Sequence, residues 1–211
     1  MNLDVLQENL AKALSISSRF TSTKAQLPVL ANIALSAKKN RLLISATNLE
    51  LSVSVSIGAK VKKEGELTIP ARVITDLVAN LNSGTLNLSS EKEHLKISSN
   101  NFTSTLAGMN SSDFPEVPYE VSKGATSFPK DTIIDSLTSV LFAASSDETR
   151  PVLTGVLLIF EQGKLTFVAT DGFRLSKKQI NIKSLKNSTN LKSLILPKNS
   201  LSELSRLSGE A

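Results

Sequence analysis

The chain has 211 residues, with 24 Lys and Arg against 19 Asp and Glu and a pI near 9.4, a balance that permits a polyanionic partner without requiring one. It contains no cysteine, which excludes a disulfide scaffold, a thiolate metal site and a cysteine nucleophile and suits the cytosol. The length suits two domains of ordinary size, and no apolar run approaches the roughly 20 residues that span a bilayer.

The first predicted element is an amphipathic helix near the amino terminus. Lys12 and Arg19 fall on its outer side when the residues are placed at helical spacing. The predicted buried stripe consists of Leu6, Leu10, Ala13 and Leu14. The helix therefore presents cations on the face opposite its core.

Strands are predicted from alternating apolar and polar residues. The alternation is unbroken over residues 49–57, which favours a half-buried antiparallel strand. Shorter segments with strand character occur at residues 42–44, 86–88, 95–97, 156–160, 165–169 and 180–182. Short turn-like linkers between several of them favour hairpins.

Three further helices are predicted. One begins at Pro70, with Arg72 pointing outward and a buried stripe of Ile74, Leu77, Val78 and Leu81. Another covers residues 129–144 and carries Asp131 and Asp135 on its outer face. The last begins at Pro197 and is expected to bury Leu201 and Leu204 and to turn Lys198 and Arg206 outward. Cations therefore lie opposite the core stripe in three of the four predicted helices.

An internal repeat divides the chain. A shift of 123 residues aligns residues 28–47 with 151–170 and gives seven identities in 20 pairs, and the helices before these segments align at the same offset. The two copies are expected to diverge by a one-residue insertion after Thr170, relative to Thr47. Residues 111–118 contain two prolines and no regular pattern, so they are predicted to form a connector between domains 1–120 and 121–211. The second copy stops soon after its second helix, and we expect a truncated domain there.

Several ordered motifs resemble one protein family. The first half contains Leu27-Pro28-Val29-Leu30, Ala46-Thr47-Asn48-Leu49-Glu50, Ile69-Pro70-Ala71-Arg72 and Asp113-Phe114-Pro115. The second half contains Arg150-Pro151-Val152-Leu153-Thr154-Gly155-Val156 and Ala169-Thr170-Asp171-Gly172-Phe173-Arg174-Leu175. At these motifs the chain resembles the first and second domains of bacterial DNA polymerase III beta subunits, the DNA sliding clamps.

The resemblance implies an α+β fold of tandem clamp domains (the processivity fold), with antiparallel sheets outside and two helices per domain lining a pore. It implies a head-to-tail ring of two chains with three domains each, of which the third is absent here. Such a ring encircles duplex DNA and is not an enzyme; it gives processivity by tethering the catalytic subunit of DNA polymerase III. The other implied partners are the clamp loader and further polymerases and repair proteins that bind through short peptides, in the bacterial cytoplasm with the nucleoid.

The resemblance also implies roles for particular residues. Contacts with DNA map to Lys24, Arg72 and Arg150, and the helical pattern adds Lys12, Arg19, Lys198 and Arg206. Such cations would meet phosphates without reading bases, while the alternative for each is an ordinary solvated charge. Where many relatives have aromatic residues after the arginine, this chain has Pro151 and Val152.

A pocket for client peptides is implied in the second domain, formed by Leu153, Thr170, Gly172, Phe173, Arg174 and Leu175. On turn chemistry alone, residues 170–172 are equally well explained as a tight turn between strands. Phe102 matches a residue at the ring interface with the neighbouring chain, and ordinary core burial is the alternative for it.

Other functions find less support in the sequence. Enzyme motifs are absent, the single histidine, His94, lies in a charged hairpin, and no cofactor or metal site is expected. The main alternative is a strand-rich protein-interaction module that does not bind DNA.

Overall fold

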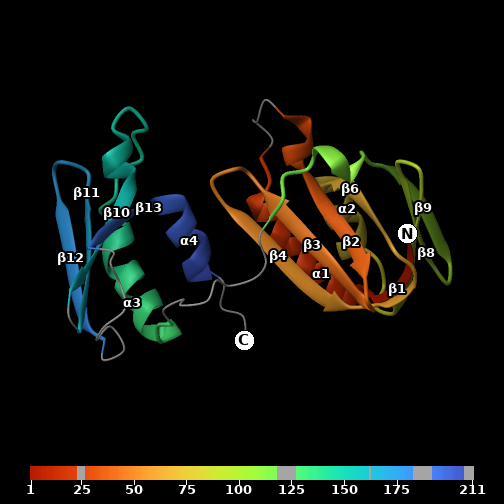
Figure 1. The fold of residues 1–211 in the computed structure, drawn as a ribbon, viewed down its shortest axis with the longest axis horizontal. Coiled ribbons are helices and arrows are strands. Elements are labelled where there is room, and N and C mark those ends of the chain that lie inside the picture. The colour runs from red at the N-terminus through yellow and green to blue at the C-terminus, as the bar shows by residue number, and fades with distance from the viewer. Residues whose placement is uncertain (23–26, 118–126, 162, 183–191, 207–211) are drawn as a thin grey trace. The chain divides into compact units, whose positions relative to one another are not determined.

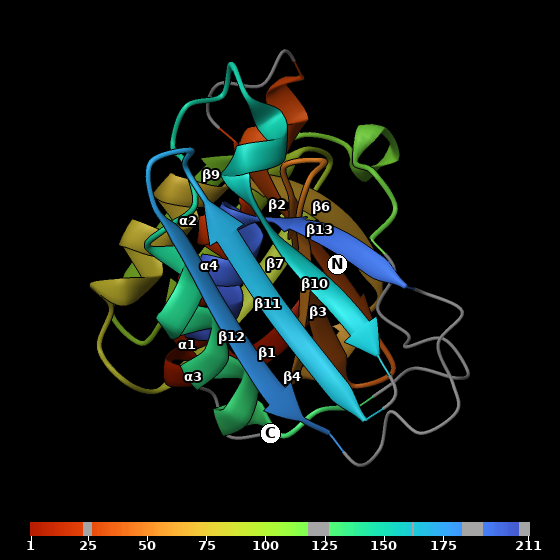
Figure 2. The same cartoon turned by 90° about the vertical axis from the view of Figure 1, so that its left-hand side faces the viewer.

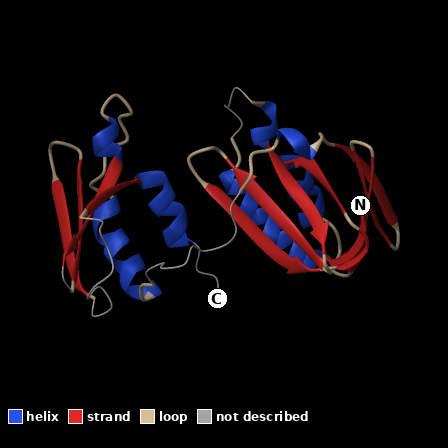
Figure 3. Cartoon of the chain, viewed as in Figure 1, coloured by secondary structure: helices blue, strands red, loops and turns tan. Residues whose placement is uncertain are grey.

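The computed structural model describes residues 1–22, 27–117, 127–161, 163–182 and 192–206 (Figure 1). They form two compact units, Met1–Glu120 and Val121–Ala211. In each, helices pack on antiparallel sheets, which confirms the predicted fold class (Figure 3). The α-helices are α1 (Gln7–Ser17), α2 (Ala71–Ala79), α3 (Lys130–Leu141) and α4 (Lys198–Arg206).

The first unit contains two sheets, in the strand orders β5-β1-β7-β8-β9 and β4-β3-β2-β6. Their strands are β1 (Asn2–Leu6), β2 (Asn32–Lys38), β3 (Arg41–Thr47), β4 (Ser52–Gly58), β5 (Lys60–Lys63), β6 (Gly65–Pro70), β7 (Thr85–Glu91), β8 (His94–Ser99) and β9 (Phe102–Ala107). Short 3-10 turns lie at η1 (Ser18–Phe20), η2 (Pro28–Ala31) and η3 (Ser111–Asp113). Aliphatic side chains from both sheets and both helices form one core, as the low aromatic content requires.

The second unit contains one sheet among its described residues, in the order β12-β11-β10-β13 (Figure 2). After a 3-10 turn η4 (Pro151–Thr154) come β10 (Gly155–Glu161), β11 (Lys164–Thr170), β12 (Leu175–Asn181) and β13 (Ser193–Pro197). This order matches β4-β3-β2-β6, and α3 and α4 lie together on one side of the sheet (Figure 3). Phe167 on β11 is fully buried in the core that the sheet forms with these two helices.

Two predicted elements begin in the wrong place. Residues 2–6 are a strand paired with β5 and β7 and not part of the first helix, because their alternation turns Leu3 and Val5 into the core; Leu6 is 54% exposed. The strand predicted over residues 49–57 starts only at Ser52, because Leu49 adopts a φ of +73° in a turn. In both cases an apolar residue at a turn or strand end fits the periodic pattern of the element that follows, so the predicted element begins too early.

Two predictions for the fourth helix are also wrong. Leu204 was expected to be buried, but it is 47% exposed among the described residues, whereas Leu201 is buried. Lys198 was expected to point outward, but it is half-buried and its Nζ donates a hydrogen bond to the carbonyl of Ala144 at 2.8 Å. Ala144 lies in the turn after α3, and a buried carbonyl outside a helix or a strand ladder needs such a donor.

Candidate functional site

The turn between β11 and β12 is fixed by its own side chains. The hydroxyl of Thr170 donates to the carbonyl of Arg174 at 2.7 Å and accepts from the N–H of Gly172 at 3.1 Å. The carboxylate of Asp171 accepts from the N–H groups of Arg174 and Phe173, at 2.9 and 3.0 Å. These backbone hydrogen bonds hold the pKa of Asp171 below its ordinary value. Gly172 takes a φ of +93°, which glycine tolerates without strain.

The first unit repeats this turn. Thr47 donates to the carbonyl of Leu51 at 2.9 Å and accepts from the N–H of Leu49, and Asn48 accepts from the N–H of Leu51 at 2.7 Å. Each residue lies 123 positions before its counterpart, and β4 and β12 start at the same offset. The insertion expected after Thr170 is therefore absent. The turn geometry belongs to the shared fold, so a site specific to the second unit has to come from the side chains that the turn carries.

The side chains around this turn gather at the C-terminal end of α3. The hydroxyl of Ser176 donates to the carbonyl of Ser139 at 2.8 Å and joins β12 to the helix. The guanidinium of Arg174 lies over the ring of Phe142, with 5.7 Å from its central carbon to the ring centroid. Its Nε pairs with Asp171 at 2.9 Å. The α3 end is thereby joined to the turn and the start of β12 by a hydrogen bond and a cation–π contact.

The predicted peptide-site residues differ in exposure. Phe173 is 99% exposed and Leu175 is 65% exposed, and Val152 and Phe142 are exposed as well. Leu153 and Thr170 are half-buried. A small cavity of about 310 Å³ brings together two of the six, Phe173 and Arg174, with Arg150. Its full lining is Ala144, Ser145, Ser146, Asp147, Arg150, Asp171, Phe173, Arg174 and Lys198.

Leu153, Thr170, Gly172 and Leu175 do not line that cavity. Gly172 nevertheless lies beside Arg150, since a Cβ atom at position 172 would be 3.8 Å from Nη1 of Arg150. Sequence reasoning missed Asp171 and Phe142 as members of this region. Asp171 lies within the quoted motif, but its partners become evident only when the turn is folded, and Phe142 is 32 residues from Arg174 in the chain.

The predicted DNA-contact residues of the first unit lie on adjoining helices. Lys12 on α1 and Arg19 on η1 are exposed, and α2, which packs against both elements, carries Arg72. The side chain of Arg72 is 93% exposed and lies 3.8 Å from Asp76, a loose pair that leaves the cation at the surface. Lys24 lies outside the described residues.

The predicted DNA-contact residues of the second unit differ in exposure and in their bonding partners. Arg150 is exposed, whereas Lys198 is half-buried and donates to the carbonyl of Ala144, in the turn that follows α3. Arg206 is exposed but pairs with Glu203 at 2.9 Å. Asp131 and Asp135 are exposed on α3, as predicted, so this helix presents carboxylates. The basic helical surface is clearest in the first unit.

Phe102 lines an apolar groove between β9 and α2. The residue is half-buried, and the groove has a volume of about 610 Å³. Its lining is Val73, Asp76, Leu77, Asn80, Leu81, Phe102 and Leu106. β9 lies at the edge of its sheet, so backbone groups and apolar side chains are presented together.

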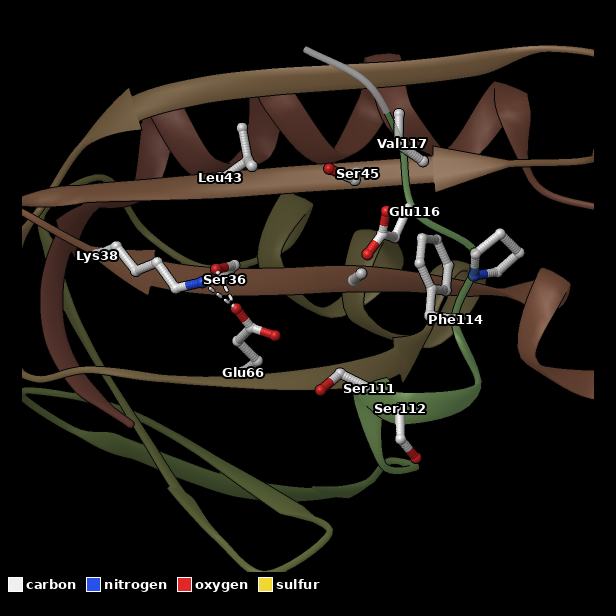
Figure 4. Close-up of a pocket in the computed structure, with 12 residues that line it drawn as sticks. Ser36, Lys38, Leu43, Ser45, Glu66, Ser111, Ser112, Phe114, Glu116 and Val117 are labelled. Atoms are coloured by element: carbon white, nitrogen blue, oxygen red, sulfur yellow. Dashed lines mark hydrogen bonds and ion pairs between the residues drawn. The ribbon is translucent and has the colours of Figure 1, made fainter.

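A cavity of about 1090 Å³ lies between the 111–117 segment and the β4-β3-β2-β6 sheet (Figure 4). Phe114, Glu116 and Val117 lie across strands that carry Ser36 and Leu43 (Figure 4). Within it, Lys38 pairs with Glu66 at 2.6 Å and holds the pKa of Glu66 below its ordinary value. The hydroxyl of Ser36 also donates to Glu66, at 3.0 Å.

Among the described residues, no group of three or more His, Asp or Glu side chains is placed to hold a metal ion. His94 is exposed at the start of β8. No helix in the described ranges has both the length and the apolar character to cross a membrane.

Comparison with known proteins gives matches along both units. Residues 1–118 match the N-terminal domain of the DNA polymerase III beta subunit, and residues 127–211 match its central domain. The beta sliding clamp of Synechococcus elongatus is 35% identical over 179 residues, covering 83% of this chain and 48% of that protein. The chain spans about half the length of the curated relatives it matches.

Solved structures show the same likeness. The DNA polymerase III beta subunit of Pseudomonas aeruginosa has a TM-score of 0.89 at 28% identity, covering 100% of this chain and 57% of that one. The beta sliding clamp of Caulobacter crescentus, solved with polyethylene glycol bound to a putative beta-motif tethering region, has a TM-score of 0.86 at 29% identity. That match covers 98% of this chain and 56% of the other.

Proposed function

Because this chain belongs to the DNA polymerase III beta subunit family, we propose that residues 1–120 and 121–211 are the first two clamp domains of a sliding clamp. The protein encircles duplex DNA and confers processivity by tethering the replicative polymerase, and it catalyses no reaction itself. Its place of action is the bacterial cytoplasm, with the nucleoid.

The observation that carries this proposal is the repeat of one helix-on-sheet unit along the chain, matched in order to two consecutive domains of one family. A sliding protein has to contact phosphates without reading bases. Exposed cations on helices suit this, since phosphate contacts supply affinity and orientation but carry no sequence information. Lys12, Arg19 and Arg72 on neighbouring elements of the first unit have that character.

The second unit supplies the client site in this proposal. The surface around Leu153, Thr170, Gly172, Phe173, Arg174 and Leu175 offers exposed apolar side chains beside a cation. Such a surface fits a short peptide with aliphatic anchors. Its clients are the catalytic subunit of DNA polymerase III, the clamp loader, and other polymerases and repair proteins.

The groove at Phe102 supplies the ring interface. Its apolar side chains and the free edge of β9 suit a second copy of the protein that adds a strand and fills the groove, in a head-to-tail dimer. Leu77, Leu81 and Leu106 are the residues that such a contact would cover. Closure of the ring then keeps the protein on DNA by topology.

Primer extension on primed circular DNA tests this function. The full-length protein, added with its clamp loader and replicative polymerase, is expected to lengthen the products made in a single polymerase-binding event. The physical reason is that a tethered polymerase rebinds at high effective concentration before it diffuses away. Reactions without the loader are the control. Product lengths that do not change when the protein is loaded would favour an interaction module that does not bind DNA.

A further inference from the structure

The repeated turn and the helix end beside it carry different side chains in the two units, and two of these side chains touch in the second unit. With the 123-residue offset that their hydrogen bonds establish, Arg174 corresponds to Leu51, and Phe142 corresponds to Arg19. On the turn, the second unit therefore has a cation where the first has an aliphatic residue. At the helix end, it has an aromatic ring where the first has a cation. The contact between Arg174 and Phe142 is therefore a feature of the second unit, and the matching residues of the first unit, Leu51 and Arg19, cannot form it.

Arg174 is held from two directions. Its Nε donates to Asp171 Oδ2 at 2.9 Å, and its guanidinium lies 5.7 Å from the centroid of the Phe142 ring, within the range of a cation–π contact. The hydrogen bond to Asp171 uses Nε, and the central carbon of the guanidinium lies over the Phe142 ring. Among the described residues no hydrogen bond uses the donors on the two Nη atoms, which leaves that edge able to meet an oxygen of a ligand.

Phe142 is unusually exposed for a phenylalanine. It caps the C-terminal end of α3 and is 58% exposed, so burial in the core does not account for a phenylalanine there. The hydroxyl of Ser176 binds the carbonyl of Ser139, one helical turn before Phe142, and fixes the helix end against β12. The last turn of α3 has no basic residue of its own, so its partial negative charge also favours the cation of Arg174.

We propose that Phe142 is a positioning residue of the client-peptide site: with Asp171 it holds Arg174 in one orientation, so that the Nη edge binds a carbonyl or carboxylate oxygen of the peptide. The inference rests on the proposed function of that surface. An arginine already ordered in the free protein loses less rotamer freedom when the peptide binds, so ordering raises affinity without adding a contact. Phe142 acts through Arg174 and does not itself touch the peptide.

A double-mutant cycle tests whether Phe142 acts through Arg174. Calorimetry with a synthetic polymerase-derived peptide would compare the full-length protein with F142L, F142Y, R174Q and F142L/R174Q. F142L is expected to weaken peptide binding about two- to fivefold, the size of an exposed cation–π contact. F142Y is expected to bind the peptide as the parent does, because the ring remains. In the R174Q background, F142L is expected to change nothing. Equal losses from F142L in both backgrounds would overturn the proposal.

A spectroscopic measurement gives a second readout that needs no peptide. The Nε–Hε resonance of Arg174 is expected to shift when F142L removes the ring, to return with F142Y, and to exchange faster with water in D171N because the carboxylate that orders it is lost. A resonance that does not respond to F142L would overturn the positioning role. If the parent protein binds no peptide while this resonance responds as expected, the proposed client function fails and the ordering of Arg174 stands.

Discussion

Neutralising Lys24, Arg72 and Arg150 together is expected to lower the affinity of the full-length protein for duplex DNA roughly a hundredfold or more at 0.1 M salt. Each phosphate contact releases condensed counterions, so each lost contact removes about 0.9 from the slope of log K against log salt. The triple variant K24Q/R72Q/R150Q should therefore reduce the slope by about two to three units. Fluorescence anisotropy with a labelled duplex over a salt series measures both quantities.

A variant with the same change in net charge provides the control. Lys96 on β8 and Lys177 and Lys178 on β12 are exposed on strands and not on the helical surface. The variant K96Q/K177Q/K178Q should leave both affinity and salt slope close to those of the parent. Equal losses in the two triple variants would mean that net charge and not the helical surface governs binding, and would remove Lys24, Arg72 and Arg150 from the DNA path.

The second large effect is expected at Leu175. Its side chain is 65% exposed at the start of β12, so replacement by aspartate costs little folding free energy. If Leu175 lines the peptide site, a carboxylate there has to be buried against aliphatic anchors without a partner. We expect L175D to weaken binding of a polymerase-derived peptide by about 2 kcal/mol or more, roughly thirtyfold, and to leave DNA affinity unchanged.

The same substitution at Leu194 is the matched control. Leu194 is 39% exposed on β13, at the other edge of the same sheet. Calorimetry should give parent-like peptide affinity for L194D and a large loss for L175D, with circular dichroism showing that both are folded. Similar peptide affinities for L175D and the parent protein would remove Leu175 from the site.

The fold could be predicted largely from the sequence because its strands and helices leave strong periodic patterns. Short segments with strand character at β3, β10 and β11 and the helical stripe of α2 indicated their positions, and the repeat indicated that the arrangement occurs twice. The strand at residues 2–6 was missed because Leu6 also fits the helical stripe that follows it. A pattern of burial alone does not say where one element ends and the next begins.

The candidate sites could be predicted only in part. The turn at Thr170 was recognised by its motif, but its hydrogen bonds are common to both units, and the distinguishing contact joins Arg174 to a residue on another element. Lys198 shows the converse limitation: helical spacing places it outward, while the carbonyl of Ala144, in the turn after α3, accepts a hydrogen bond from its ammonium group. Which charged side chains remain available to a ligand depends on neighbours that are distant in the chain.

Release from circular DNA tests the central claim of encirclement most directly. The full-length protein would be loaded onto nicked circular DNA, separated by gel filtration in salt high enough to abolish ordinary electrostatic binding, and run again after the circle is cut once. A ring held by topology should elute with the circle and leave the linear DNA by sliding off its ends. Equal retention on circular and linear DNA, or loss from both, would contradict encirclement by this protein.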